Sequence, residues 1–309
     1  MKLAFVFPGQ GSQSVGMLSS FAENETVQNV LARANAALGE DLAGMIAEGP
    51  AEVLNLTVNT QPAMLTASVA MYEAWCAMGG VKPEIMAGHS LGEYSALTAA
   101  GVFSLEDAVR LVKFRATAMQ EAVPVGVGAM AAILGLTDEQ VEEACAKSRD
   151  LGVVEAVNFN SPGQVVIAGV KAAVEKACVE AKALGAKRGL LLPVSVPSHS
   201  SMLTPASEAL RAKLVDVEMA QPTVDVVANI DVVAHKDVEE IREALAKQVS
   251  GPVQWVKTIK HFEAMGVTHI VECGPGRVLA GLIKRIAPSI EVKNINSQES
   301  LVAVLEELK

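Results

Sequence analysis

A serine enclosed by two glycines, in the stretch Gly88-His89-Ser90-Leu91-Gly92, is the feature that most restricts how this chain can fold. The apolar run 84–88 before it predicts a strand, and the pattern over 91–100 predicts a helix. Such a tight strand-to-helix turn needs small residues on both sides of the serine, here Gly88 and Gly92, and it lifts the hydroxyl above the end of a sheet. We therefore expect an α/β fold with a reactive Ser90, although a glycine-rich turn with a bystander serine has the same local pattern.

Apolar strands and helical patterns alternate over most of the chain, which predicts a parallel sheet covered by helices on both faces. After Pro124 the order changes to strand, helix, strand, strand, helix, strand, which is typical of a ferredoxin-like unit. The predicted elements of this region are 128–134, 138–148, 153–159, 164–168, 171–184 and 189–194. We therefore predict a larger α/β unit, residues 1–123 and 198–309, interrupted by a ferredoxin-like βαββαβ unit, residues 124–197.

Composition excludes several classes of protein. The chain has 309 residues, of which 50% are hydrophobic and 19% charged, so it can bury a core and is not a disordered chain. Its net charge of −10 argues against nucleic-acid binding, which needs a basic surface. With 7 Phe, 2 Trp and 2 Tyr, it also has few side chains on which bases could stack.

The sequence contains long uncharged windows, at 3–22, 53–72 and 189–207, but polar residues and prolines interrupt each of them. A membrane-spanning helix needs about 20 mainly apolar residues, so we predict none. The second window overlaps a helix predicted at 60–78, with Pro62 in its first turn. Four widely spaced cysteines and no grouped metal ligands predict a cytoplasmic protein with reduced thiols and no bound metal.

A reactive serine needs a base, and the chain offers five histidines. We favour His199, because it lies in an uncharged window between prolines where no nearby acid explains it as a surface ion pair. A buried structural histidine is the alternative. His89 adjoins the serine but is expected to point away from it. No aspartate motif presents itself to orient His199, so we expect a backbone carbonyl to hold the ring.

Two further features have open interpretations. The loop Gly9-Gln10-Gly11-Ser12-Gln13 follows the first strand but lacks the third glycine of a dinucleotide fingerprint. It is either an ordinary turn or the source of a backbone N–H that joins that of Leu91 in stabilising an oxyanion. In the helix predicted at 105–123, Arg115 falls at the edge of the apolar face. A partly buried arginine there either binds an anion or forms a structural salt bridge.

Taken together, the motifs resemble the malonyl-CoA:acyl carrier protein transacylases of type II fatty acid synthesis. The resemblance runs nearly from end to end and includes Phe7-Pro8-Gly9-Gln10-Gly11-Ser12-Gln13, Gly88-His89-Ser90-Leu91-Gly92-Glu93-Tyr94, Asn158-Phe159-Asn160-Ser161-Pro162-Gly163-Gln164, Pro197-Ser198-His199, Pro252-Val253-Gln254-Trp255 and Gly274-Pro275-Gly276. Several blocks in one order are far more specific than one turn. The resemblance implies an α/β-hydrolase-like larger subdomain with a ferredoxin-like insert.

The resemblance also implies roles at the matching positions. Ser90 would be the nucleophile and His199 its base, oriented by the backbone carbonyl of Gln248. Gln10 and Leu91 would supply the oxyanion N–H groups, and Arg115 would bind the malonyl carboxylate. Leu91 after the serine favours malonyl over methylmalonyl. Ser200 departs from the cysteine of some members, a difference from which we expect no mechanistic consequence.

The resemblance predicts a two-step transfer from malonyl-CoA to acyl carrier protein by a monomer, without a cofactor, nucleic acid or membrane. Acyl carrier proteins are acidic, so docking needs local basic groups, for which we select Lys187-Arg188 and Lys284-Arg285. Two alternatives remain. A serine hydrolase would need an aspartate and then a histidine after the serine, such as Asp231 with His261 or His269. A carrier-protein-binding scaffold without activity would leave Ser90 unmodified.

Overall fold

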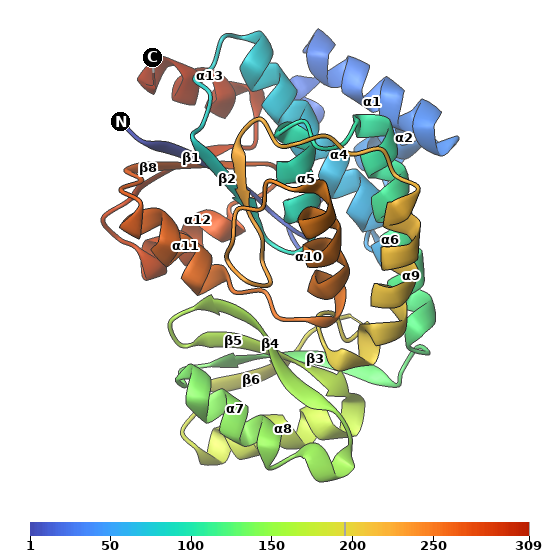
Figure 1. The fold of residues 1–309 in the computed structure, drawn as a ribbon, viewed down its shortest axis with the longest axis vertical. Coiled ribbons are helices and arrows are strands. Elements are labelled where there is room, and N and C mark those ends of the chain that lie inside the picture. Colours follow the sequence, from blue (N-terminus) through green and yellow to red (C-terminus); the bar gives the residue numbers. More distant parts are fainter. Residues whose placement is uncertain (195, 309) are drawn as a thin grey trace.

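The computed structural model describes residues 1–194 and 196–308, and the strands within them form two sheets (Figure 1). The larger sheet is five-stranded and parallel throughout, in the order β7-β2-β1-β8-β9. Its strands are β1 (Leu3–Phe7), β2 (Ile85–Gly88), β7 (Asp225–Val227), β8 (His269–Cys273) and β9 (Glu291–Ile295). The parallel sheet predicted from the alternating pattern is therefore confirmed.

Helices cover both faces of this sheet because its central strand is apolar on both sides. In β1, Leu3, Phe5 and Phe7 belong to one buried cluster and Ala4 and Val6 to another, as the two-residue period of a strand requires. Helices α1, α4 and α6 pack into the first cluster, and α11 and α12 into the second. The helices of this larger unit are α1 (Glu25–Leu38), α2 (Leu42–Glu48), α3 (Ala51–Leu54), α4 (Thr57–Ala77), α5 (Gly92–Ala99), α6 (Leu105–Ala122), α9 (Thr204–Val215), α10 (Val238–Ser250), α11 (Trp255–Ala264), α12 (Val278–Ile286) and α13 (Gln298–Glu307).

The smaller unit lies at the bottom of Figure 1 and has an antiparallel sheet in the order β4-β5-β3-β6. Its elements are β3 (Gly128–Leu134), α7 (Asp138–Ala146), β4 (Val154–Ser161), β5 (Gln164–Val170), α8 (Lys171–Ala183) and β6 (Arg188–Leu191). Both helices pack on one face of this sheet, whereas Met130, Val157 and Val166 form a separate cluster on the other. The predicted ferredoxin-like βαββαβ order is confirmed. Its boundaries at 124 and 197 stay a prediction.

The two units meet where β4 runs beside the residues that precede α11. The backbone N–H of Val253 donates to the carbonyl of Val157 at 2.8 Å, and that of Phe159 donates to the carbonyl of Val253 at 3.1 Å. The carboxylate of Glu155 accepts hydrogen bonds from the backbone N–H and hydroxyl of Ser201, at 2.7 and 2.8 Å. These contacts fix the small sheet beside the segment that carries His199.

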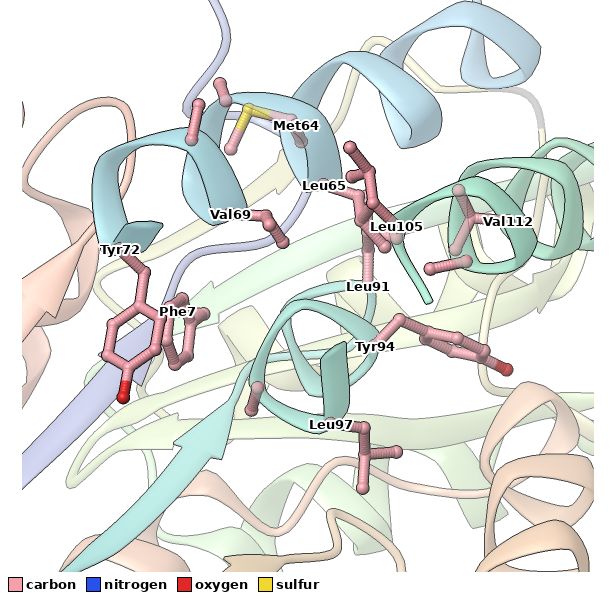
Figure 2. Close-up of a cluster of buried hydrophobic side chains, with 14 of the residues drawn as sticks. Phe7, Met64, Leu65, Val69, Tyr72, Leu91, Tyr94, Leu97, Leu105 and Val112 are labelled. Atoms are coloured by element: carbon pink, nitrogen blue, oxygen red, sulfur yellow. The ribbon is translucent and has the colours of Figure 1, made fainter. Parts of the chain in front are cut away.

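Helix α5 starts directly after the serine turn and is enclosed by its neighbours. Figure 2 shows Leu91, Tyr94 and Leu97 of this region among side chains from α4 and α6, including Leu65 and Leu105, and all five are buried. An enclosed helix has little freedom to shift in a close-packed interior. The N–H groups at its start therefore have a fixed direction.

Some elements differ from the prediction. Helix α4 begins at Thr57, three residues before the predicted start, so Pro62 lies in its second turn rather than its first. The pattern over 252–265 also predicts a helix, but α11 begins only at Trp255. The structure also contains α2, α3, β9 and α13, which the sequence pattern did not predict.

Candidate active site

The turn between β2 and α5 holds Ser90 in a left-handed conformation, with φ at 53°. The flanking glycines are required by close packing. A Cβ on Gly88 would lie 1.8 Å from the backbone carbon of Gly92, and a Cβ on Gly92 would lie 2.0 Å from the Phe7 carbonyl oxygen. A strained conformation of this kind is kept only when its surroundings fix it, and it is a feature of functional sites. The structure thus has the geometry of a nucleophile elbow.

His199 lies against this serine. Its Nε2 is 2.7 Å from Ser90 Oγ, and its Nδ1 is 2.7 Å from the backbone carbonyl oxygen of Gln248. Because that carbonyl can only accept, Nδ1 carries the proton, and Nε2 is free to accept from the hydroxyl. Burial, and then the charge of Arg115, lowers the pKa of His199 to about 3. The imidazole is therefore neutral and able to accept a proton at neutral pH.

Arg115 also reaches the serine, from helix α6. Its Nη2 lies 3.5 Å from Ser90 Oγ and donates to Gln248 Oε1 at 2.9 Å, while Nη1 donates to Gln61 Oε1 at 2.7 Å. The guanidinium lies over the ring of Tyr94, 5.2 Å from its centroid, and its Nε has no hydrogen-bond partner in the described chain. These direct partners are amide oxygens and an aromatic ring, and the buried Glu93 acts on the guanidinium through its charge without a direct hydrogen bond in the described chain.

The exposure of Arg115 differs from the sequence prediction. The helical pattern placed it at the edge of the apolar face and partly buried, but only 1% of the residue is exposed. Helix α6 packs on α4 and α9 as well as on α1, so the buried surface is wider than a single stripe. Burial lowers the pKa of this guanidinium, which makes an anionic partner more favourable.

The first loop lies beside the elbow. A Cβ on Gly9 would come within 2.5 Å of the His89 carbonyl oxygen, and the N–H of His89 donates to the carbonyl of Phe7 at 3.0 Å. Within the described residues, the backbone N–H groups of Gln10 and Leu91 donate no hydrogen bond. Free backbone donors near a reactive serine are what an oxyanion hole requires.

Two polar residues behind the elbow were missed by the sequence reasoning. Asn229 accepts from the Ser90 N–H through Oδ1 and donates to the Gly88 carbonyl through Nδ2, both at 2.7 Å. Glu93 Oε2 accepts from the Asn229 N–H at 3.0 Å and from Gln248 Nε2 at 2.8 Å. Burial raises the pKa of Glu93 to about 7. A carboxylate within a short apolar helix was the one signal for this network in the sequence.

Three of the other four histidines have partners of their own. His89 Nε2 is 2.7 Å from Asn160 Oδ1, and burial lowers its pKa. His235 lies 2.9 Å from Asp231, and His269 lies 3.2 Å from Glu291. Asp231 and His269, two of the residues named for a hydrolase triad, are thus paired elsewhere, and Ser90 has His199 as its partner.

In residues 1–194 and 196–308, no cluster of three or more His, Cys, Asp or Glu side chains could hold a metal ion. Over the same residues, no helix combines the length and the apolar character needed to cross a bilayer. All four cysteines are free thiols.

Comparisons with known proteins agree with this geometry. Residues 4–304 match the acyl transferase domain family. The chain is 53% identical over 306 residues to the malonyl CoA-acyl carrier protein transacylase of Escherichia coli K12. This alignment covers 99% of each protein. The acyl-carrier-protein S-malonyltransferase structure from Burkholderia pseudomallei has a TM-score of 0.98 at 57% identity, covering 99% of this chain and 100% of that one.

A further similar structure was solved together with a partner protein. It is a malonyl-transacylase in complex with a type II PKS acyl-carrier protein, with a TM-score of 0.98 at 48% identity, and it covers 99% of this chain and 100% of that one. Both the sequence and the fold therefore agree over nearly the whole length of each relative. The chain belongs to the acyl transferase family, within its group of malonyl CoA-acyl carrier protein transacylases.

Proposed function

We propose that this protein transfers a malonyl group from malonyl-CoA to the phosphopantetheine thiol of acyl carrier protein, for fatty acid biosynthesis. The observation that carries the proposal is the position of Arg115, whose Nη2 lies 3.5 Å from the hydroxyl of a serine paired with a neutral histidine. A serine–histidine pair serves many acyl transfers. A buried guanidinium beside it favours acyl groups that end in a carboxylate, and the names of the relatives point to the same substrate.

In the first half-reaction, Ser90 Oγ attacks the thioester carbonyl of malonyl-CoA while His199 Nε2 takes the hydroxyl proton. The carbonyl oxygen becomes an oxyanion, which the N–H groups of Gln10 and Leu91 stabilise. The C–S bond then breaks, and the proton on His199 passes to the sulfur of coenzyme A as it leaves. The product is a malonyl ester on Ser90. The carbonyl of Gln248 holds the ring throughout and stabilises the imidazolium.

The second half-reaction uses the same groups in reverse. His199 takes the proton of the phosphopantetheine thiol, and the thiolate attacks the ester carbonyl of Ser90. The C–O bond breaks, Ser90 regains its proton from His199, and malonyl acyl carrier protein leaves. The two steps need no cofactor, because both thioesters have similar energies and the protein supplies only a nucleophile, a base and hydrogen-bond donors. Substrates that bind in turn to one site give ping-pong kinetics.

The carrier protein would dock at one end of the small sheet. Arg188 is in register with Leu134, which is in register with Gln164, and Arg285 Nη1 donates to Gln164 Oε1 at 3.1 Å. The basic pairs Lys187-Arg188 and Lys284-Arg285 therefore lie along one edge, at this end of the small sheet. Gln164 also pairs with Ser161, next to the Asn160 that contacts His89. This edge adjoins the serine turn, which suits delivery of a thiol by an acidic partner.

Intact-mass measurement tests the proposal. The protein is mixed with malonyl-CoA, its mass is recorded, and holo acyl carrier protein is then added, with the Ser90→Ala variant as the control. We expect a malonyl adduct on the wild-type protein and none on Ser90→Ala. The adduct should then be transferred to the carrier protein. An adduct that water removes before the carrier is added would indicate a hydrolase. Absence of any adduct would indicate a non-catalytic scaffold.

A further inference from the structure

A chain of side-chain hydrogen bonds leads from Arg115 to the first loop, Gly9 to Gln13, which carries the proposed oxyanion donor. Arg115 Nη1 donates to Gln61 Oε1 at 2.7 Å, Gln61 Nε2 donates to Thr57 Oγ1 at 3.1 Å, and Thr57 Oγ1 donates to Gln10 Oε1 at 2.9 Å. Gln61 and Thr57 lie one turn apart on α4. The chain thus starts at the group proposed to bind the substrate carboxylate and ends on Gln10, whose N–H is proposed to stabilise the oxyanion.

Chemistry fixes the direction of the two bonds at Gln61 in this chain. A guanidinium can only donate, so the amide oxygen of Gln61 must face Arg115 and its NH₂ group must face Thr57. The Thr57 hydroxyl accepts from that NH₂ group, which leaves its own proton to donate to Gln10. Hydrogen bonds that run in one direction from a cation polarise and strengthen one another.

The loop that receives this chain has few other side-chain attachments. Gln10 and Gly11 are both exposed. A second attachment in the described chain runs from the Gly11 N–H to Gln13 Oε1 at 2.7 Å and from Gln13 Nε2 to Asn55 Oδ1 at 2.9 Å. Both attachments end just before or within the first turn of α4, but only the one through Thr57 continues to Arg115.

We propose that Gln61 and Thr57 are positioning residues that couple recognition of the substrate carboxylate to the placement of the Gln10 oxyanion donor. An acyl group whose carboxylate engages Arg115 fixes the guanidinium, and through Gln61 and Thr57 it fixes the loop in its productive position. An acyl group without a carboxylate leaves the chain unanchored at its first member. Selection for malonyl would then act on the rate of acylation as well as on binding, as expected when binding energy far from the reacting atoms is used in the transition state. This inference rests on the proposed function.

The test compares acylation of Ser90 by malonyl-CoA and acetyl-CoA in single-turnover experiments. Thr57→Val removes the hydroxyl but keeps the side-chain shape, and Thr57→Ser keeps the hydroxyl. We expect Thr57→Val to lower the maximal malonyl acylation rate about tenfold with little change in the malonyl-CoA concentration for half-saturation, because loosening an oxyanion donor costs less than the ~10²–10³-fold of deleting one. Acetyl acylation should change less, and Thr57→Ser should restore most of the malonyl rate.

Asn55→Ala is the matched control, because it breaks the attachment that does not lead to Arg115. We expect Asn55→Ala to lower the rates of malonyl and acetyl acylation by the same factor. A double-mutant cycle should show coupling of Thr57→Val with Arg115→Ala for malonyl, and none for Asn55→Ala with Arg115→Ala. Equal slowing of malonyl and acetyl by Thr57→Val would overturn the coupling, even with the proposed function intact. Failure of the unmodified protein to accept malonyl would instead contradict the proposed function.

Discussion

Replacing Arg115 by alanine should convert a malonyl-selective site into one that accepts neutral acyl groups. A carboxylate held by two charged hydrogen bonds gains about 1.5–3 kcal/mol from each. The guanidinium is already desolvated in the free protein, with 1% of the residue exposed, so binding adds the desolvation of the carboxylate only. Discounting for that, we expect the ratio of malonyl to acetyl kcat/KM to fall by ~10²–10³-fold, at about 1.4 kcal/mol for each factor of ten.

The assay is the transfer of each acyl group to holo acyl carrier protein, measured over a range of acyl-CoA concentrations. Arg110→Ala is the matched control, since Arg110 lies on the same helix with 53% of its side chain exposed and pairs with Asp107. We expect the control to keep the wild-type ratio. Arg115→Lys keeps the charge but loses the planar fork, so its ratio should lie between those of the wild type and Arg115→Ala.

Loss of stability must be separated from loss of recognition. Removing the guanidinium leaves the Gln61 and Gln248 amide oxygens without a buried donor, which costs about 1–3 kcal/mol for each. Thermal unfolding of each variant therefore accompanies the kinetics, which are compared at a temperature where all variants are folded. A folded Arg115→Ala variant with an unchanged malonyl-to-acetyl ratio would refute the assignment of this arginine.

Three further results follow from the site and its turn. Burial raises the folded-state pKa of Glu93 to about 7, so ionising this carboxyl costs stability as the pH rises from about 4.5 to 7. The advantage of Glu93→Gln over the wild type in unfolding free energy should therefore grow between pH 5 and 8 by about 2–4 kcal/mol, with a matching rise in relative Tm. A difference that is constant with pH would contradict this. Burial lowers the pKa of His199 to about 3, so His199 should stay neutral between pH 8 and 5. In the Glu93→Gln variant, which lacks the carboxyl that titrates near 7, kcat/KM for acylation should therefore be flat over this range. A decline centred near 6.5 would instead show a histidine with its ordinary pKa. Gly88→Ala should yield no folded protein, since its Cβ would lie 1.8 Å from backbone, whereas Gly281→Ala, on a helix with open space around it, should raise stability by about 0.5–1 kcal/mol in chemical denaturation.

The sequence was sufficient to predict the two-unit architecture because the elements that define it carried local signals. The glycines around Ser90 marked the elbow, and the order of strands and helices after Pro124 marked the inserted unit. His199 could be selected because it lies in an uncharged window between prolines, whereas His89, next to the serine, was expected to point away from it. The Gln10 and Gln248 roles came only from family resemblance, since a backbone N–H or carbonyl leaves no trace in the identity of its residue.

Other features depend on contacts between distant segments. Arg115 is fully buried because α4 and α9 both pack on its helix, which the period of one helix cannot reveal. Asn229 supports the elbow from a loop 139 residues away, and no pattern near either residue indicates the contact. The edge strand β9 is only partly buried along most of its length, so it lacks the apolar run that marked the central strands.

The site is also assembled from parts that a ribosome makes at different times. The Ser90 carbonyl and the Gln248 amide that holds it are 158 residues apart, and His199 depends on the carbonyl of the same glutamine. At ~5–20 residues per second, translation separates the two by roughly 8–30 seconds. During that interval the nascent chain carries a serine without an oriented base, so it cannot be charged with an acyl group. Any fragment that ends before Gln248 should share this inertness, however well its first strands fold.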